Sequence, residues 1–440
     1  MNVESLRTNR TRYRFIGWHT VAVLSLSIAV LSMVSPQIGQ LGRGLWTTLP
    51  ALVLSWFGII QVSPHAFRRS FYRFRIVFLL GFLFLTQAAL RFIYADDSHD
   101  LWVTFFMGPL LTLVLLLWVG AYAELGKDTV RQLRRWVLFG WCASLALGLP
   151  VLIAHPEVAR LTMGNKLAVE NAATWAPYGV GEYSVYTSLS ICLSPLFFVA
   201  LDLRGTIRWL AIILVLLAAT AVVFSTFTMA SILAALGLIG TLVVWASAGR
   251  GWSRMWRAMI VLFPLALLIL LYSSASLLPQ TELVVSKAER LYGGISTYGL
   301  RNGEETGRGE MFERDIRVFS EEPFLGYIPH VTGQRDSGHS SLANSLVLFG
   351  IFCTALWVGA LWSIFKRSLN DSGNSIAKGS LLISWLALFL GGILNPIWHS
   401  PMALGAMFVL TVPVRKNPME KTIQGRTLRR YIGHRRNEHG

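Results

Sequence analysis

Residues 209–248 read WLAIILVLLAATAVVFSTFTMASILAALGLIGTLVVWASA, and no Asp, Glu, Lys or Arg interrupts them. One helical crossing of a hydrocarbon core about 30 Å thick takes about 20 residues. The run is therefore long enough to cross a membrane twice. We expect two helices, 209–225 and 228–248, that separate at Ser225-Thr226-Phe227-Thr228. Such a run predicts a membrane protein.

The composition of the whole chain supports this prediction. The chain has 440 residues, of which 54% are hydrophobic and 14% charged, whereas soluble proteins carry about 25% charged residues. Lys and Arg outnumber Asp and Glu by 39 to 23, which gives a net charge of +16. These figures exclude an ordinary soluble enzyme, a disordered chain and a disulfide-stapled secreted domain. They predict an all-α polytopic membrane protein.

Ten further apolar stretches bring the expected number of transmembrane helices to about 12. They are 15–35, 45–63, 76–95, 101–123, 136–154, 185–203, 258–274, 341–365, 380–394 and 402–414. The chain then divides into spans 1–9 within 1–274, a long loop at 275–340 between spans 9 and 10, spans 10–12 within 341–414, and a basic tail at 415–440. A medium loop at 155–184 lies on the same side as the long one.

The positions of the cations indicate the orientation. Of the 39 Lys and Arg residues, 28 fall in seven alternating segments: 1–14, 64–75, 124–135, 202–208, 249–257, 366–379 and 414–440. Cytoplasmic loops carry such an excess, so both termini are expected in the cytoplasm. Separately, we expect the first span to be retained rather than cleaved as a signal peptide. The excess charge therefore orients helices, and nucleic acid is not expected as a partner. The tail can bind anionic membrane lipids or simply anchor the last helix.

The cysteines indicate no redox or metal framework. Cys142, Cys192 and Cys353 all fall in expected spans and lack the spacing of a disulfide or metal site. We interpret them as small apolar packing residues.

The long loop carries helical patterns of its own, at 283–291 and 308–320. In the second, Phe312, Ile316 and Phe319 fall on one face, with charged residues opposite. This pattern predicts an amphipathic helix near the membrane surface. Pro323 should end it.

The sequence Ser337-Gly338-His339-Ser340-Ser341 directly precedes the tenth span and fits a helix start. The positive end of a helix dipole disfavours imidazolium, so His339 should stay neutral and able to accept a proton. The same helix end offers N–H groups to an anion such as phosphate. A histidine that merely caps the helix or lies at the interface remains an equal alternative.

Two stretches of this region resemble a known family, the bacterial O-antigen ligases and the related O-antigen polymerases. His339-Ser340 is followed by nine residues and then Gly350, as in the ligases. Gly307-Arg308, the amphipathic run and Glu322-Pro323-Phe324-Leu325-Gly326-Tyr327 resemble the family's upstream stretch. Two departures stand out. Cys353 occupies a position of Gly, Thr or Tyr, and Thr228-Met229 aligns with a common Ser-Arg.

The resemblance implies an inverting glycosyltransferase of the bacterial inner membrane, with a periplasmic active site and no metal or other cofactor. The donor would be a glycan on undecaprenyl diphosphate and the acceptor a sugar hydroxyl of lipid A-core, with His339 as base. Arginines suit the leaving diphosphate. The candidates are Arg308, which matches the family stretch, Arg91, the only cation inside an expected span, and Arg160 in the medium loop. Arg91 can instead snorkel to the interface. Cleft candidates are Tyr327, His330 and Ser340.

Other interpretations remain open. The loop Asp96-Asp97-Ser98-His99-Asp100 offers metal-ligand chemistry, although a polar turn is favoured. We interpret His399 as an interfacial residue. An O-antigen or exopolysaccharide polymerase would use the same donor. A transporter of lipid-linked glycan is a third class, but no repeated halves are visible.

Overall fold

The structure, a computed structural model, describes residues 3–40, 45–93, 103–155, 158–161, 174–181, 183–202, 206–225, 227–247, 308–326, 340–372, 375–394 and 397–412. Within these ranges the chain forms helices and turns and no strand. The helices are α1 (Val3–Val34), α2 (Pro36–Gln40), α3 (Leu45–Val62), α4 (Ala66–Arg73), α5 (Arg75–Ile93), the π-helix η1 (Val103–Met107), α7 (Gly108–Leu125), α8 (Lys127–Ala154), α9 (Val158–Leu161), the 3-10 turn η2 (Ala176–Tyr178), α11 (Tyr183–Asp202), α12 (Thr206–Phe224), α13 (Thr228–Ser247), α16 (Arg308–Glu321), α17 (Ser341–Asp371), α18 (Ser375–Leu394) and α19 (Pro401–Thr411).

Among the residues that the structure describes, six helical segments are long and apolar enough to cross a membrane. They are Gly17–Val34, Phe105–Leu125, Lys127–Ala154, Ala176–Leu201, Ser341–Asp371 and Ile376–Ile393. α3 and α4 form a pair bent by 106°, and shorter apolar helices cover Arg75–Leu90, Ala211–Phe224, Ala230–Trp245 and Pro401–Thr411. These helices indicate a multi-pass, all-α membrane protein. The count of twelve stays a prediction, and the expected span 258–274 lies outside the described residues.

The break expected inside the long apolar run is confirmed. α12 ends at Phe224 and α13 begins at Thr228. The Ser225 N–H donates to the Ala221 carbonyl at 2.9 Å, and the Ser225 hydroxyl donates to the Val222 carbonyl at 2.6 Å. These bonds satisfy polar groups of the last turn, which would otherwise be costly to leave unpaired between two apolar helices.

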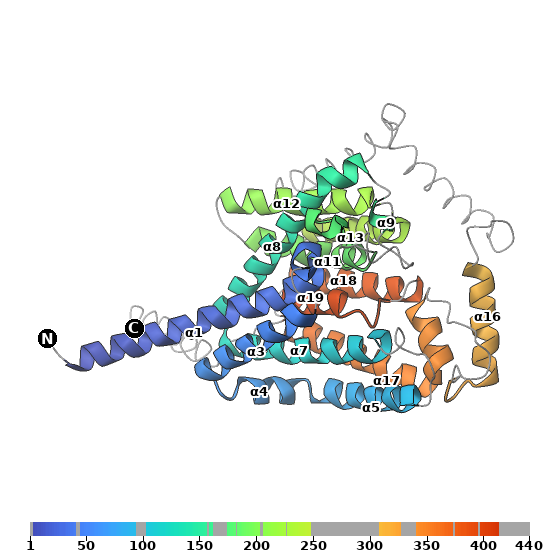
Figure 1. Cartoon of the computed structure of the whole chain (residues 1–440), viewed down its shortest axis with the longest axis horizontal. Helices are drawn as coiled ribbons and strands as arrows, with labels where there is room; N and C mark the ends of the chain where they lie inside the picture. The colour runs from blue at the N-terminus through green and yellow to red at the C-terminus, as the bar shows by residue number, and fades with distance from the viewer. Residues whose placement is uncertain are drawn as a thin grey trace, which may run out of the picture.

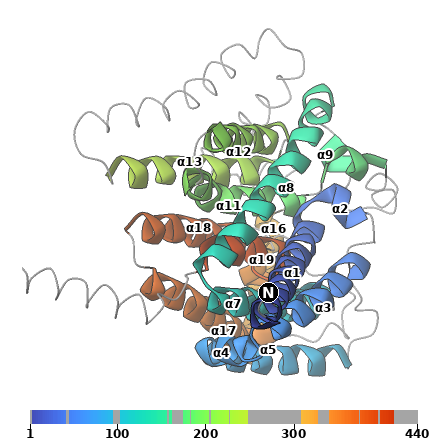
Figure 2. The same cartoon turned by 90° about the vertical axis from the view of Figure 1, so that its left-hand side faces the viewer.

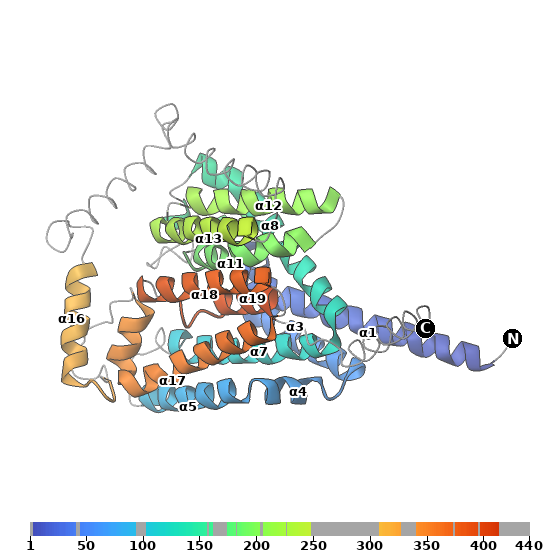
Figure 3. The ribbon, with the colours of Figure 1, turned by 180° about the vertical axis from the view of Figure 1, so that it is seen from behind.

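The helices lie mostly side by side and give the molecule two distinct ends (Figure 1). α4 and the first turns of α1 lie toward one end, and α16 lies across the opposite end, as the reverse view also shows (Figure 3). We call these the α4 end and the α16 end. An amphipathic helix that lies across the ends of spans fits the surface position expected for 308–320. The observed helix and the turn at Pro323 confirm its predicted bounds closely.

α11 is the central helix, and it packs against α8, α12, α13, α18 and α19 (Figure 2). Thr187, Ser188 and Ser190 on it are buried. The Ser190 hydroxyl lies 2.8 Å from the carbonyl oxygens of both Tyr186 and Ala230. Small hydroxyl residues let helices approach closely and bind carbonyl groups in an apolar surrounding. The three cysteines are also buried and free of disulfides, as expected.

Some helices extend beyond the expected spans. α1 begins at Val3 rather than near residue 15, and α18 begins at Ser375 rather than at 380. The segment 64–75, expected as a loop, contains α4. The length of an apolar run predicts only the part of a helix that lies inside the membrane. Arg and Lys are good helix formers, so a helix can continue past the end of the apolar run.

α5 and α17 run antiparallel, which two contacts show. At the α4 end, Arg73, just before α5, binds Asp371 at the end of α17, with Nη2 2.8 Å from Oδ2. Farther along, the rings of Phe84 and Phe349 lie 5.3 Å apart, edge to face. α5 therefore runs toward the α16 end beside residues 349–371 of α17.

Candidate functional site

α17 begins where the sequence predicts. The Ser340 hydroxyl accepts a hydrogen bond from the Ala343 N–H at 3.1 Å, which makes Ser340 the N-cap, and it is 8% exposed. This bond satisfies one of the four N–H groups that a helix start leaves unpaired. His339 precedes the cap by one residue and lies outside the described residues, as do Tyr327 and His330.

A backbone contact joins the two stretches that carry the family resemblance. Gly350 interrupts α17 with φ 67° and ψ −177°, and Gly326 has φ 73°. The Ile351 N–H, freed by this kink, donates to the Pro323 carbonyl at 2.9 Å. A Cβ on Gly350 would meet the carbonyl of Phe324, and a Cβ on Gly326 would meet the backbone of Gly350. We call this the glycine contact; both positions need glycine because of their φ and because of the close approach.

A second set of polar residues lies around the start of α17. We call it the serine–histidine cluster, and it consists of Ser341, Ser345, Trp398 and His399. The loop between α18 and α19 folds back so that the Trp398 N–H donates to the Ser341 hydroxyl at 2.9 Å. The Ser345 hydroxyl donates to the Ser341 carbonyl at 2.6 Å, and His399 Nε2 lies 3.4 Å from the Ser345 oxygen. The Trp357 indole N–H donates to the Trp398 carbonyl at 3.1 Å.

His399 is 2% exposed, so the expectation of an interfacial residue was wrong. Phe105 lies 4.7 Å from its ring, and Phe84 and Trp357 each lie 5.9 Å from it in nearly parallel orientation. Nδ1 is buried without a hydrogen-bond partner among the described residues, which costs about 1–3 kcal/mol. Burial lowers the pKa of His399, so the imidazole is neutral at pH 7.

Arg91 lies on α5, which packs against α17. It follows Phe84 by two helical turns, about 10 Å at 1.5 Å per residue. Phe84 contacts Phe349, the residue before the kink at Gly350. The helix of Arg91 therefore contacts α17 beside this kink.

The other two arginines have different positions. Arg308 begins α16, at the end of that helix away from the glycine contact, roughly 20 Å along its axis. Arg160 lies on α9, which Figures 1 and 2 place beside α8, on the side of the molecule away from α5 and α17. The helix of Arg91 thus packs against α17, whereas that of Arg160 lies apart from it.

The orientation of α16 reveals a residue that the sequence analysis missed. Asp315 is 5% exposed, whereas Ile316, on the expected apolar face, is 53% exposed. A signal was present, because Asp315 falls three residues after Phe312 and four before Phe319, within the apolar stripe. The carboxyl of Asp315 therefore turns toward the protein, and Ile316 lies exposed at the surface.

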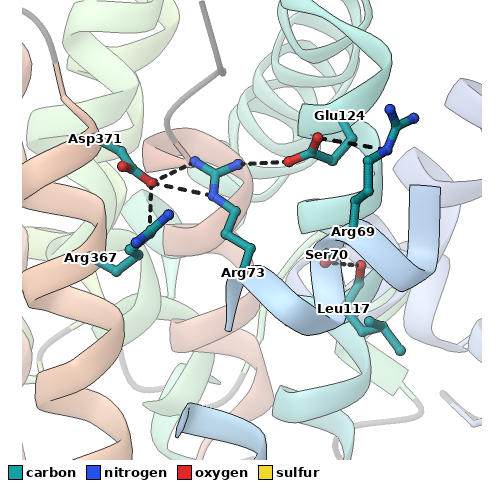
Figure 4. A network of polar contacts seen from close by, with 7 residues as sticks. All are labelled: Arg69, Ser70, Arg73, Leu117, Glu124, Arg367 and Asp371. Atoms are coloured by element: carbon teal, nitrogen blue, oxygen red, sulfur yellow. Dashed lines mark hydrogen bonds and ion pairs between the residues drawn. The ribbon is translucent and has the colours of Figure 1, made fainter. Parts of the chain in front are cut away.

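At the α4 end, charged side chains form what we call the ion-pair cluster: Arg69, Arg73, Glu124, Arg367 and Asp371 (Figure 4). Arg73 Nη1 lies 3.6 Å from Glu124 Oε1, and its Nε donates to Asp371 at 3.3 Å. The side chains of Arg73 and Glu124 are 8% and 5% exposed. The cluster joins α4, α7 and α17, three segments expected on the cytoplasmic side.

Arg134 ties the end of a further helix, α19, to α8. Its guanidinium donates to the carbonyl oxygens of Val409 at 3.0 Å and Val412 at 2.6 Å, at the end of α19. A cation at a helix C-terminus pairs with carbonyls that the helix leaves free and with the negative end of its dipole. Some arginines counted as topological signals thus also hold helices together.

In the part of the chain that the structure describes, no group of three or more His, Cys, Asp or Glu residues lies close enough together to hold a metal ion. The candidate acidic loop Asp96–Asp100 lies outside it. No protein-family model, curated protein or solved structure matches the chain. The family resemblance therefore rests on the residues given above.

Proposed function

We propose that this chain is an O-antigen ligase of the bacterial inner membrane, with about twelve spans, cytoplasmic termini and a periplasmic active site. It transfers a glycan from undecaprenyl diphosphate to a sugar hydroxyl of lipid A-core. The observation that carries the proposal is the glycine contact. Two stretches that resemble the ligases, one containing Gly326 and the other Gly350, meet backbone to backbone, as parts of one site should.

The chemistry assigns a role to each group. The acceptor hydroxyl loses its proton to neutral His339 as its oxygen attacks the anomeric carbon from the face opposite the diphosphate. A base in that position typically contributes about 10²–10⁴-fold in rate. The bond to the diphosphate breaks with inversion, and the leaving group gains negative charge. Arg91 and Arg308 meet that charge, while the first N–H groups of α17 add a positive helix end.

Of the arginines, Arg91 has the strongest structural support, because its helix packs against α17 beside the kink at Gly350. Arg308 is tied to the same region through α16 and the turn at Pro323. Arg160 has weaker support, since α9 lies apart from α5. We therefore expect Arg160→Ala to affect transfer less than Arg91→Ala.

Purified protein supplied with a lipid-linked glycan and lipid A-core tests the proposal. His339→Ala should reduce transfer by at least about 100-fold, whereas His155→Ala, at a histidine in the other long loop, should leave it within about twofold. Retained transfer by His339→Ala would remove the base from the mechanism. Transfer abolished by a chelator would instead point to the acidic loop at 96–100.

A deletion strain separates the ligase from a polymerase that uses the same donor. Loss of a ligase leaves long glycan chains on the lipid carrier and none on lipid A. Loss of a polymerase leaves lipid A with a single repeat unit. The second outcome would overturn the ligase assignment while keeping the donor chemistry.

A further inference from the structure

The loop that carries His399 is fixed to the start of α17 rather than left at the surface. Trp398 is held on three sides: its N–H by the Ser341 hydroxyl, its carbonyl by Trp357, and its indole N–H by the Leu388 carbonyl at 3.1 Å. Its neighbour His399 is held against the next hydroxyl, Ser345. The loop therefore binds α17 at two positions one helical turn apart.

The hydrogen bonds of Ser345 indicate which ring nitrogen of His399 carries the proton. The Ser345 hydroxyl gives its only proton to the Ser341 carbonyl, at 2.6 Å. Its oxygen is then left to accept, so the neutral imidazole must carry its proton on Nε2. The remaining lone pair, on Nδ1, has no partner among the described residues. A phenylalanine would suit the surrounding rings without this penalty, so packing alone does not account for a histidine at this position.

We propose that His399 is a positioning residue for the transfer reaction, holding the first turn of α17, and thus the base at His339, through Ser345. This inference rests on the proposed function. His339 precedes Ser341 by two residues, and Ser341 bonds both to Ser345 and to the loop. A displacement of a reacting group by about 1 Å can lower a rate by about 10²-fold.

Three substitutions of His399 separate positioning from packing. His399→Phe keeps an aromatic ring but removes the N–H to Ser345. His399→Gln can place an amide N–H near the position of Nε2, whereas the shorter His399→Asn reaches only that of Nδ1. We expect Phe and Asn to lower kcat about 10–100-fold, as for other orienting residues, with KM within about twofold. Gln should recover most of kcat.

Amide hydrogen exchange of residues 341–345 gives a readout that does not depend on activity. It should quicken in His399→Phe and His399→Asn but not in His399→Gln, and exchange in α11 should stay unchanged. His155→Phe is the matched control and should alter neither kcat nor this exchange. Equal kcat in the Gln and Asn variants would overturn the inference even if His399→Phe fails to fold.

The failure of this inference is distinguishable from that of the proposed function. If His339→Ala is inactive and His399→Phe matches the wild type in kcat and exchange, only the positioning role is overturned. If His339→Ala transfers glycan normally, the proposed base is wrong, and the exchange data alone then decide whether His399 holds α17. A raised KM with unchanged kcat in His399→Asn would also exclude positioning.

Discussion

The two ends of the molecule are fastened by different chemistry. At the α4 end, buried Arg73 binds the carboxylates of Glu124 and Asp371, and so joins three helices. At the α16 end, the serine–histidine cluster and the glycine contact join neutral groups: hydroxyls, an imidazole, carbonyls and backbone N–H groups. The contacts that hold the two ends therefore differ in charge.

This difference has a physical use if the proposed function holds. A carboxylate paired with an arginine beside the start of α17 would compete with a diphosphate for that arginine. Neutral contacts fix the start of α17 without such competition. No diphosphate is proposed to bind at the α4 end, and there ion pairs join the helices.

The largest effect is expected at the α4 end, from Arg73→Met. This substitution removes the guanidinium that lies 3.6 Å from Glu124 and 2.8 Å from Asp371, and the loss of one member of a buried ion pair typically costs about 3–5 kcal/mol. Denaturation of the detergent-solubilised protein should show a strongly lowered stability. Arg69→Met is the control, since the Arg69 side chain is 49% exposed and 3.9 Å from Glu124. Equal effects of both substitutions would show that burial does not govern the cluster.

Gly350→Ala tests the α16 end and should cost about 2–4 kcal/mol. The φ of 67° strains any residue with a Cβ, and that Cβ would collide with the Phe324 carbonyl. Gly359→Ala on the same helix is the control, because its Cβ would meet only Leu80 at 3.4 Å. Thermal denaturation should separate the two variants clearly. A Gly350→Ala protein as stable as Gly359→Ala would disprove the glycine contact.

Ser340→Ala should have a smaller effect, about 1 kcal/mol, through loss of the N-cap bond to Ala343. Ser340→Asn retains a capping oxygen and should behave like the wild type. Amide exchange in the first turn of α17 measures the difference more directly than global denaturation. If Ala and Asn variants exchange alike, the cap contributes nothing to this end.

The smallest effect is expected from Arg367→Ala. Its side chain is 50% exposed and pairs with Asp371 one turn away on the same helix, at 3.1 Å. Exposed pairs of this kind contribute about 0.5 kcal/mol or less. If the Arg367→Ala protein denatures like the wild type, the stability of the ion-pair cluster comes from buried Arg73 rather than from this exposed pair.

Local signals allowed several features to be predicted from the sequence. The break at Ser225, the bounds of α16 and the cap at Ser340 each depend on residues within a few positions of the feature. The apolar runs indicated an all-α membrane protein for the same reason. The stretches around Gly326 and Gly350 were recognised by resemblance, but nothing in their spacing showed that they touch.

Contacts between residues far apart in the chain could not be predicted from the sequence. Arg73 was counted as one of many cytoplasmic cations, because its partners Glu124 and Asp371 come from distant helices. His399 was expected at an interface, since a single histidine in a short loop shows nothing of the rings that enclose it. Asp315 was missed because the stripe that contains it was assigned through its apolar neighbours.

The bond from Arg73 to Asp371 also has a consequence for the order in which the protein assembles. Its partners are separated by 298 positions, so it cannot form until nearly every helix has been synthesised. The partners in the glycine contact lie within residues 323–351 and can meet as soon as α17 enters the bilayer. The glycine contact can thus form during translation, before the bond from Arg73 to Asp371, and chains truncated before residue 371 should retain the first contact and lack the second.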